Sequence, residues 1–369
     1  MKKIIWAILT ILFFSACDPT GKLNSGNNRE EVYTGIRPKN IILMIGDGMG
    51  LSQISAGFYR NGDQLNLEQF PVIGIHKPYS ASDLITDSAA GATAFSTGKK
   101  TFNKAVGMDK DSAFSKTILE EAMKQGLATG LVVTSTIVHA TPAAFVAHVD
   151  DRYKYEDIAK FFLLNQVDYF VGGGEKYFKE RADGLDLVGM LKERGYVISD
   201  YEEEPFTDVV LDFSRKFGYF TSYDDPEKYS EGRDYLVPAS KQAPLFLSHR
   251  SEKGFFLMIE GSQIDWGGHD NDSGYIISEM IDFDRAVGAI LDFAKEDGET
   301  LVIVTADHET GGYAINKGST RDSIIGRFTT SDHTAALIPV FAYGPGSALF
   351  SGIYENTAIY DKMKAVFGF

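Results

Sequence analysis

Cysteine is nearly absent from this chain. Its 369 residues include only Cys17, so no disulfide can form within the chain and the fold depends on its apolar core. Positive charge is also scarce, because 36 Lys and Arg accompany 51 Asp and Glu and give a formal net charge of −15. So acidic a surface argues against nucleic acid or an anionic membrane as partner, and it repels phosphate esters. An anionic substrate therefore needs strong local positive charge, which bound metal ions can supply.

A long hydrophobic run is also missing at the amino terminus. The apolar run Ile4–Phe14 has eleven residues, whereas a helix that spans a bilayer needs about 20. Two lysines precede this run and small residues follow it, so we expect residues 1–16 to be a signal segment that is removed on export. The mature protein is then expected to be periplasmic or lipid-anchored at the bacterial outer membrane.

Cys17 follows the signal segment directly, after Ser15-Ala16. This arrangement resembles a bacterial lipoprotein signal, in which the cysteine is acylated and becomes the mature amino terminus. Phe14 departs from the leucine that is usual three positions before such a cysteine, and an ordinary cleaved signal beside a free thiol is the alternative. Residues 17–37 are predicted to form a lipidated or flexible tether.

Three common catalytic and nucleotide-binding motifs are missing as well. Gly46–Gly50 does not match Gly-x-Gly-x-x-Gly, because position 51 is leucine, and this excludes the dinucleotide-binding fingerprint. Six residues separate Gly91 from Gly98, where a P-loop has four. The chain also lacks the Gly-x-Ser-x-Gly elbow of serine hydrolases.

Strands alternate with helices from residue 38 to residue 369, which predicts one large α/β domain. We expect a doubly wound sheet flanked by helices on both faces, with ligands at the carboxyl ends of the strands. The predicted strands are 40–45, 130–135, 168–171, 196–199, 255–260, 301–306 and 339–343. The predicted helices are 51–59, 86–96, 117–124, 142–149, 185–194, 240–251, 273–295 and 356–367. Residues 199–237 are acidic and aromatic without a clean period, and we expect an irregular insertion there.

Polar ligand residues follow three of these apolar strands. The strand 255–260 ends in Glu260, and Asp265 and His269 follow it within nine positions. The strand 301–306 is followed directly by Asp307 and His308. Asp47 comes shortly after the first strand, 40–45. Carboxylates at the end of a buried strand are costly unless something pairs them. The repeated pattern therefore predicts a polynuclear metal site at one edge of the sheet.

Ser88, in Thr-Asp-Ser-Ala-Ala-Gly (86–91), is placed at the start of a predicted helix. Its simplest role is that of an ordinary helix cap. The same position suits a nucleophile, because amide donors and the helix dipole stabilise an anion there. With no nucleophile elbow in the chain, a metal ion is the most direct activator of this hydroxyl.

Further ligand and substrate-binding candidates lie outside the strand ends. His333 is isolated in polar sequence. It can be a structural histidine, or it can bind a metal ion together with Asp265 and His269. Thr141 can be an oxygen ligand. Arg152 can grip two phosphate oxygens, although a surface pair with Asp150 or Asp151 is the simpler alternative. His148 is taken as structural.

Taken together, the motifs resemble the alkaline phosphatase family over residues 38–369. Each string is weak alone, but the seven occur in the order that the family has. They are Ile-Gly-Asp-Gly-Met-Gly (45–50), Thr-Asp-Ser-Ala-Ala (86–90), Ala-Thr-Pro-Ala-Ala (140–144), Ala-His-Val with Arg152 three positions on (147–152), Glu-Gly-x-x-Ile-Asp (260–265), Thr-Ala-Asp-His (305–308) and His-Thr (333–334).

The resemblance implies metal-dependent hydrolysis of small phosphate monoesters at alkaline pH, with Ser88 as the nucleophile that becomes phosphoserine. It implies two zinc ions and one magnesium ion, Arg152 on the phosphoryl oxygens, and a homodimer. The implied ligand sets are Asp265, His269 and His333 for the first zinc, Asp47, Asp307, His308 and Ser88 for the second, and Asp47, Thr141 and Glu260 for magnesium.

Two positions depart from the best-known bacterial pattern. His139 stands where aspartate is common, so we expect the third site to accept zinc or to bind magnesium more weakly. Trp266 stands where lysine is common, which removes a cation near the phosphate and is expected to weaken phosphate binding. The same pair resembles some marine and cold-environment members of the family.

Other functions of the same superfamily remain as alternatives from the sequence. A phosphodiesterase, a phosphonate hydrolase and a sulfatase use related metal sites, but Arg152 without a second basic cluster favours a monoester. A non-catalytic, metal-binding surface lipoprotein is a further alternative, and the serine at a helix start argues against it.

Overall fold

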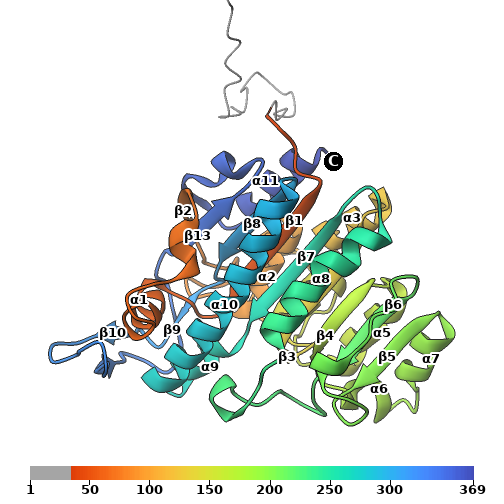
Figure 1. Cartoon of the computed structure of the whole chain (residues 1–369), viewed down its shortest axis with the longest axis horizontal. Helices are drawn as coiled ribbons and strands as arrows, with labels where there is room; N and C mark the ends of the chain where they lie inside the picture. Colours follow the sequence, from red (N-terminus) through yellow and green to blue (C-terminus); the bar gives the residue numbers. More distant parts are fainter. Residues whose placement is uncertain (1–34) are drawn as a thin grey trace, which may run out of the picture.

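A ten-stranded mixed sheet forms the centre of the molecule (Figure 1). The computed structural model describes residues 35–369, so the expectations for the signal segment and Cys17 lie outside the described residues. The strand order is β14-β2-β13-β8-β1-β7-β3-β4-β6-β5, and of these ten strands only β13 runs against the others. The strand bounds are β1 Asn40–Gly46, β2 Val72–Lys77, β3 Ala128–Thr136, β4 Tyr169–Gly173, β5 Tyr196–Asp200, β6 Lys216–Phe220, β7 Phe255–Gly261, β8 Thr300–Thr305, β13 Ile338–Tyr343 and β14 Gly352–Glu355. Four two-residue strands, β9 Glu309–Thr310, β10 Ala314–Ile315, β11 Gly326–Arg327 and β12 His333–Thr334, pair outside this sheet.

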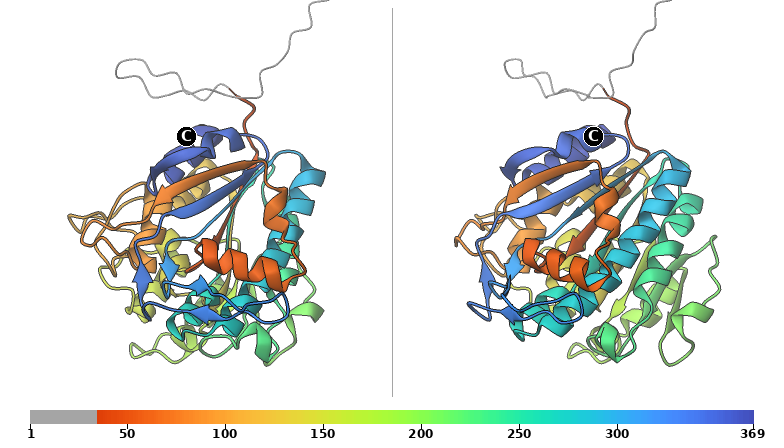
Figure 2. Two further views of the ribbon diagram at one scale, coloured as in Figure 1. Left: turned by 90° about the vertical axis from the view of Figure 1, so that its left-hand side faces the viewer. Right: turned by 60° about the vertical axis from the view of Figure 1, so that its left-hand side comes forward.

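Helices cover both faces of the sheet, as Figures 1 and 2 show. One layer consists mainly of α1 Leu51–Arg60, α8 Leu236–Arg250 and α10 Ser273–Asp297. The other consists mainly of α2 Ser88–Thr97, α3 Ile118–Gln125, α4 Ala140–Val146, α5 Tyr155–Leu164, α7 Leu187–Glu193 and α11 Ala358–Phe367. Two short helices, α6 Lys176–Lys179 and α9 Gln263–His269, complete the set together with the 3-10 turns η1 Asn66–Gln69, η2 Phe206–Asp208, η3 Tyr229–Glu231 and η4 Ser347–Phe350.

The two cores follow from alternation along the central strands. In β1, Ile41, Leu43 and Ile45 belong to the core beneath α2–α5, and Ile42 and Met44 belong to the core beneath α8 and α10. Successive side chains of a strand point to opposite faces, so a strand covered on both sides must be apolar throughout. This explains the continuous apolar runs of the sequence and confirms the predicted doubly wound α/β fold.

Helix ends are set by local sequence signals. The Thr117 hydroxyl accepts a hydrogen bond from the Glu120 amide, and the Glu120 carboxylate accepts one from the Thr117 amide, which is the capping box at the start of α3. The same helix ends at Gly126, whose φ of 81° suits glycine. These signals make the start and end of this helix predictable from sequence.

The expected irregular insertion at 199–237 needs a correction. It contains β6, which lies within the main sheet between β4 and β5 and pairs in parallel with both. Four of its five residues are buried, so the strand shows no polar alternation, and its short length hides it among loops. The segment also holds the last residues of β5 and the first residues of α8, and between them the short 3-10 turns η2 and η3 lie among loops.

Other boundaries also differ from the expectations. The helix expected to run to Val149 ends at Val146, because Ala147 is extended and Val149 forms a β-bridge with Val106. Helix α5, the edge strand β14 and its neighbour β2 were not predicted. None of the helices in residues 35–369 has the length and apolar composition needed to cross a bilayer.

His148 is packed as the sequence indicated. Its ring bonds the Gly107 carbonyl through Nδ1 at 2.6 Å and the Glu120 carboxylate through Nε2 at 2.9 Å. Burial lowers the pKa of His148, but the hydrogen bond and charge of Glu120 outweigh it and raise the pKa above the ordinary 6.5. The pair therefore joins two segments that are far apart in sequence by a pH-dependent bond.

We predict that His148→Gln destabilises the protein more at pH 6 than at pH 9. The raised pKa of His148 means that its protonation stabilises the fold fully below 6.5 and that this contribution is lost as the pH rises through the folded-state pKa. The expected loss at pH 6 is about 1 kcal/mol more than at pH 9. Denaturant unfolding at both pH values measures it. The exposed His249, changed to Gln as a control, should show no such difference; equal losses for His148→Gln at both pH values would contradict the assignment.

Candidate metal centre and nucleophile

The register of the central strands brings the predicted ligands together. Ile45 of β1 pairs with Glu260 of β7 on one side and with Thr305 of β8 on the other. Asp47 and Asp307 therefore follow neighbouring parallel strands at one edge of the sheet, and both are fully buried, as is Glu260. The sequence prediction that the carboxylates share one edge is confirmed.

The ligand residues fall into three groups. Within each group the candidate ligand atoms lie within 4.8 Å of one another. The groups are Asp265 with His269 and His333, Asp47 with Asp307 and His308, and Asp47 with His139 and Glu260. Asp47 belongs to two of them, so its carboxylate lies between two candidate ion positions. Thr141, in the first turn of α4, is buried beside the Glu260 carboxylate.

Asp47 and one nitrogen of His139 lack hydrogen-bond partners within the described protein. Neither oxygen of Asp47 has a hydrogen-bond partner among residues 35–369, and the same holds for Nδ1 of His139. Buried polar atoms are normally hydrogen-bonded, so unpaired carboxylate oxygens and an unpaired imidazole nitrogen mark a place for a cation. Oxygen and imidazole donors of this kind fit zinc and magnesium.

Electrostatics give the same indication. Burial is the main cause that raises the pKa of Glu260, to about 8. Burial, followed by the charges of Asp307 and Asp265, also raises the pKa of Asp47 well above its ordinary value. Like charges packed without water disfavour ionisation, and a bound divalent cation reverses this.

The Asp265 group is arranged around facing imidazole nitrogens. Nε2 of His269 and Nε2 of His333 are 3.1 Å apart, and they lie 3.3 and 3.5 Å from oxygens of Asp265. Each ring uses Nδ1 on a backbone carbonyl, His269 on that of Ser331 and His333 on that of Thr86. These bonds place the proton on Nδ1 and leave both Nε2 atoms free to bind one ion.

Ser88 is the first residue of α2 and has 1% of its surface exposed. Its Oγ lies 3.3 Å from Nε2 of His308, which is 3.1 Å from an oxygen of Asp307. Gly91, one turn further on, permits this approach, because a Cβ there would lie 3.0 Å from Cβ of Asp307. The cap of α2 is Asp87, which accepts from the Ala90 amide, so Ser88 is not itself the cap.

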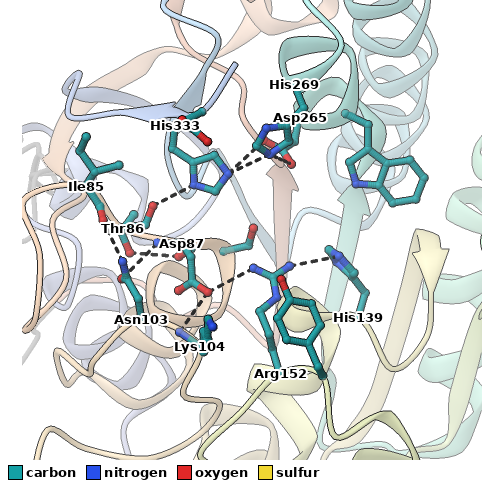
Figure 3. A pocket seen from close by; sticks show the side chains of 14 residues that line it. Ile85, Thr86, Asp87, Asn103, Lys104, His139, Arg152, Asp265, His269 and His333 are labelled. Atoms are coloured by element: carbon teal, nitrogen blue, oxygen red, sulfur yellow. Dashed lines mark hydrogen bonds and ion pairs between the residues drawn. The ribbon is translucent and has the colours of Figure 1, made fainter. Parts of the chain in front are cut away.

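Arg152 lines the same cavity. Its Nη1 lies 3.2 Å from Oδ2 of Asp87, and its Nη2 lies 3.1 Å from Nε2 of His139 (Figure 3). Burial lowers the pKa of Arg152, but the nearby Asp87 and Asp47 charges outweigh it and raise it above the ordinary value. The alternative that Arg152 pairs with Asp150 or Asp151 is wrong, since Asp87 holds it.

The cavity that these residues surround has a volume of about 430 Å³. Ser88, Arg152, His139, Asp265, His269 and His333 line it, and Trp266 lies on its wall, with the indole ring 6.2 Å from the ring of His139. All twelve site residues predicted from the sequence therefore meet in or directly beneath one cavity.

Two supporting residues were not identified from the sequence. Asp87 was read only as part of a helix-start motif, and its second oxygen orients Arg152. Thr310 donates a hydrogen bond to Asp265 and lies 3.2 Å from Nδ1 of His308, so it joins two of the ligand groups. Its position three residues after Asp307 was the one available signal.

Comparison with known proteins fits this geometry. The family model for alkaline phosphatase matches residues 38–325. The chain belongs to the alkaline phosphatase family. Alkaline phosphatase 3 of Bacillus subtilis is 36% identical over 447 residues, covering 96% of this chain and 94% of the relative. The alkaline phosphatase of Escherichia coli is 34% identical over 405 residues, covering 89% and 86%.

Solved alkaline phosphatases share the fold. The enzyme of the Antarctic bacterium TAB5 superposes with a TM-score of 0.84 at 46% identity, covering 90% of this chain and 99% of that one. Structures of two variants of that enzyme, with a histidine changed to glutamate or to aspartate, are described with Mg bound in the M3 site. The chain is thus an alkaline phosphatase enzyme whose site is built for divalent metals.

We predict that the metal-free protein loses stability as the pH rises from about 5 to 8. Glu260 and Asp47 have raised pKa values when folded, so over this range these two carboxyl groups hold more protons in the folded state than in the unfolded state. Thermal unfolding after treatment with a chelator measures the effect, and added zinc should reverse it by about 3 kcal/mol at a hundredfold excess over Kd.

The matched control for this measurement is Glu260→Gln, which is close in shape and uncharged. It should lose less stability over the same pH range in the metal-free state. A metal-free wild type whose unfolding temperature stays constant from pH 5 to 8 would contradict the account of uncompensated carboxylates.

Proposed function

We propose that this enzyme hydrolyses small phosphate monoesters at alkaline pH through a phosphoserine at Ser88. The observation that supports this best is the position of Ser88, whose Oγ stands at the start of a buried helix, 3.3 Å from Nε2 of His308 and in one cavity with Arg152. A serine in that position is directed at the ligand cluster, whereas Asp87 fills the role of the helix cap.

For the metal ions we propose two zinc ions and one magnesium ion. Asp265, His269 and His333 would hold one zinc, and Asp47, Asp307 and His308, with Ser88 approaching, would hold the other. Asp47, Thr141 and Glu260, beside His139, would hold magnesium. When bound, these ions supply Lewis acidity that favours the ionised serine and offsets the charge on the leaving oxygen. The three groups of ligand atoms within 4.8 Å support this assignment.

The protein's own residues supply binding and orientation. The Arg152 guanidinium is fixed by Asp87 and offers its N–H donors to the non-bridging phosphoryl oxygens. Ser88 Oγ attacks phosphorus, the alcohol leaves with a proton, and water then cleaves the phosphoserine and releases inorganic phosphate. The amide groups at the start of α2 face the phosphoryl charge. Because the contacts are to the phosphoryl group, little selectivity for a simple uncharged alcohol is expected.

We predict that Ser88→Ala loses nearly all hydrolysis of 4-nitrophenyl phosphate with zinc and magnesium present. The reason is that the covalent step needs the Oγ, and nucleophile removal costs several orders of magnitude, on the order of 10⁴-fold or more. Ser351→Ala, an exposed serine far from the cavity, is the control and should keep full activity.

The same assay distinguishes the competing mechanisms. Rapid acid quenching of wild type during turnover should yield a phosphorylated peptide that contains Ser88. Full activity in Ser88→Ala would mean that water attacks directly. If wild type cleaves bis(4-nitrophenyl) phosphate but no monoester, the proposed function is wrong and the enzyme is a phosphodiesterase.

His139 and Trp266 distinguish this site from the pattern with aspartate and lysine. His139 replaces a carboxylate at the third group, so magnesium should bind more weakly and zinc should compete for the position. The Antarctic relative's variants with an acidic residue in place of a histidine, described with Mg at M3, support this. Trp266 offers no positive charge, which favours weak phosphate binding and fast product release.

We predict that His139→Asp raises magnesium affinity about tenfold or more, because it restores a hard oxygen ligand and adds a negative charge. Titration of the zinc-loaded protein with magnesium by calorimetry measures the change. His148→Gln serves as a histidine control outside the ligand groups. Unchanged magnesium affinity in His139→Asp would contradict the role given to His139.

We further propose that the enzyme is exported and held at the bacterial outer membrane by acylated Cys17, and that it is a homodimer. The signal pattern before Cys17 supports the anchor. Asn40 begins β1, at the end of the strand opposite to Asp47. The described chain starts beside this end of the sheet (Figures 1 and 2). A tether leaving there would keep the catalytic cavity directed away from the membrane.

A further inference from the structure

Lys104 is a second cation in the wall of the catalytic cavity. It lines the same 430 Å³ space as Ser88 and Arg152. The charge of Arg152 is paired with Asp87, whereas the Lys104 ammonium is exposed and makes no ion pair with residues 35–369. The chain has a net charge of −15. An unpaired lysine in the mouth of an anion-binding cavity therefore attracts negatively charged groups to that position.

The backbone at Lys104 is in a conformation that suits glycine or asparagine. Its φ is 76°, which costs a residue with a Cβ about 1 kcal/mol or more. Two hydrogen bonds hold it there, because its amide donates to Oδ2 of Asp87 at 3.0 Å and its carbonyl accepts from the Arg152 amide at 2.8 Å. The turn therefore needs this conformation but does not need a lysine, and strain of this kind is typical of functional sites.

These bonds also fix where the side chain can reach. Figure 3 shows Asp87 between Lys104 and Arg152. Both cations lie near the ring of Tyr153. Nζ of Lys104 is 5.8 Å and Cζ of Arg152 is 5.9 Å from the centre of this ring. Tyr153 is 61% exposed, and with Ile85 it gives the mouth of the cavity an apolar wall. A substrate whose phosphoryl group is at Arg152 would extend its alcohol part past this wall toward Lys104.

We propose that Lys104 binds a second anionic group on the alcohol part of the substrate, so that the enzyme prefers phosphate monoesters whose leaving group itself carries a carboxylate or a further phosphate. This inference rests on the proposed monoester hydrolysis. Lys104 contacts the part of the substrate that does not react, and it is a specificity residue rather than a catalytic one. Its interaction is the same before and during the reaction, so it acts on KM and kcat/KM and leaves kcat unchanged.

The test compares phenyl phosphate with 4-carboxyphenyl phosphate, which differ by one negative charge on the leaving group. Lys104→Asn removes the cation and keeps a residue that tolerates the backbone conformation. We expect it to lower kcat/KM for 4-carboxyphenyl phosphate about two- to fivefold, the range of one exposed ion pair, and to leave phenyl phosphate unchanged. The wild-type preference should diminish in 0.5 M salt.

Two further variants serve as controls. Lys104→Arg keeps the charge and should keep the preference. Lys39→Asn removes one exposed lysine before β1, at the opposite sheet edge, and should change neither substrate. The unfolding temperature of Lys104→Asn should equal or exceed that of wild type, because asparagine relieves the strained conformation. A loss of activity in this variant therefore cannot be explained by a loss of folding.

The outcomes separate this inference from the proposed function. If Lys104→Asn affects both esters equally, or neither, the assignment of Lys104 as a subsite is wrong while monoester hydrolysis stands. If kcat rather than KM changes for the carboxylated ester, Lys104 acts on the reaction and not on binding, which also overturns it. Wild type inactive on both esters would remove the proposed function itself.

Discussion

Everything at this site depends on keeping several carboxylates together without water. Asp47, Glu260, Asp265 and Asp307 are all at least 96% buried, and bringing four such groups into one place is among the most costly arrangements in a protein interior. Asp265 and Asp307 are compensated by the chain, since neighbouring histidines outweigh the effect of burial and lower the pKa of both carboxyls. Asp47 and Glu260 have raised pKa values and need positive charge from outside the chain, and this requirement defines the site as one for divalent cations.

The sheet supplies the rigidity that such an arrangement needs. β1 lies between β7 and β8 in the middle of ten strands, with helices packed on both faces. The ligands are held by strand ends whose register is fixed by two apolar cores, because a shift by one residue would turn every core side chain to the other face. Metal ligands on rigid elements can keep like charges close together when the ions leave.

Much of the site could be predicted from the sequence because most of the ligand candidates follow a long apolar strand that is easy to recognise. Long apolar runs such as 255–259 are recognisable, and the residues after them must meet at one sheet edge. The sequence alone does not predict which side chains from different elements contact one another. Asp87 looks like any helix cap, and its hold on Arg152 depends on a loop sixty-five residues away coming to rest beside α2.

The peripheral strands of the sheet were harder to predict from the sequence than the central ones. β6 is short, contains glycine and lies buried among neighbouring strands, so it has neither the length nor the alternation that marks a strand. The edge strand β14 and its neighbour β2 contain few fully buried residues, and their pairing is decided by contacts distant in sequence. Local patterns therefore predict the central strands well and the peripheral ones poorly.

The most direct test of the central claim is anomalous diffraction at the zinc absorption edge from crystals of the active enzyme. The account predicts zinc peaks within bonding distance of two groups, Asp265 with His269 and His333, and Asp47 with Asp307 and His308. Active crystals that show no anomalous peak at either group would mean that the buried carboxylates are stabilised in some other way, and the account would be wrong.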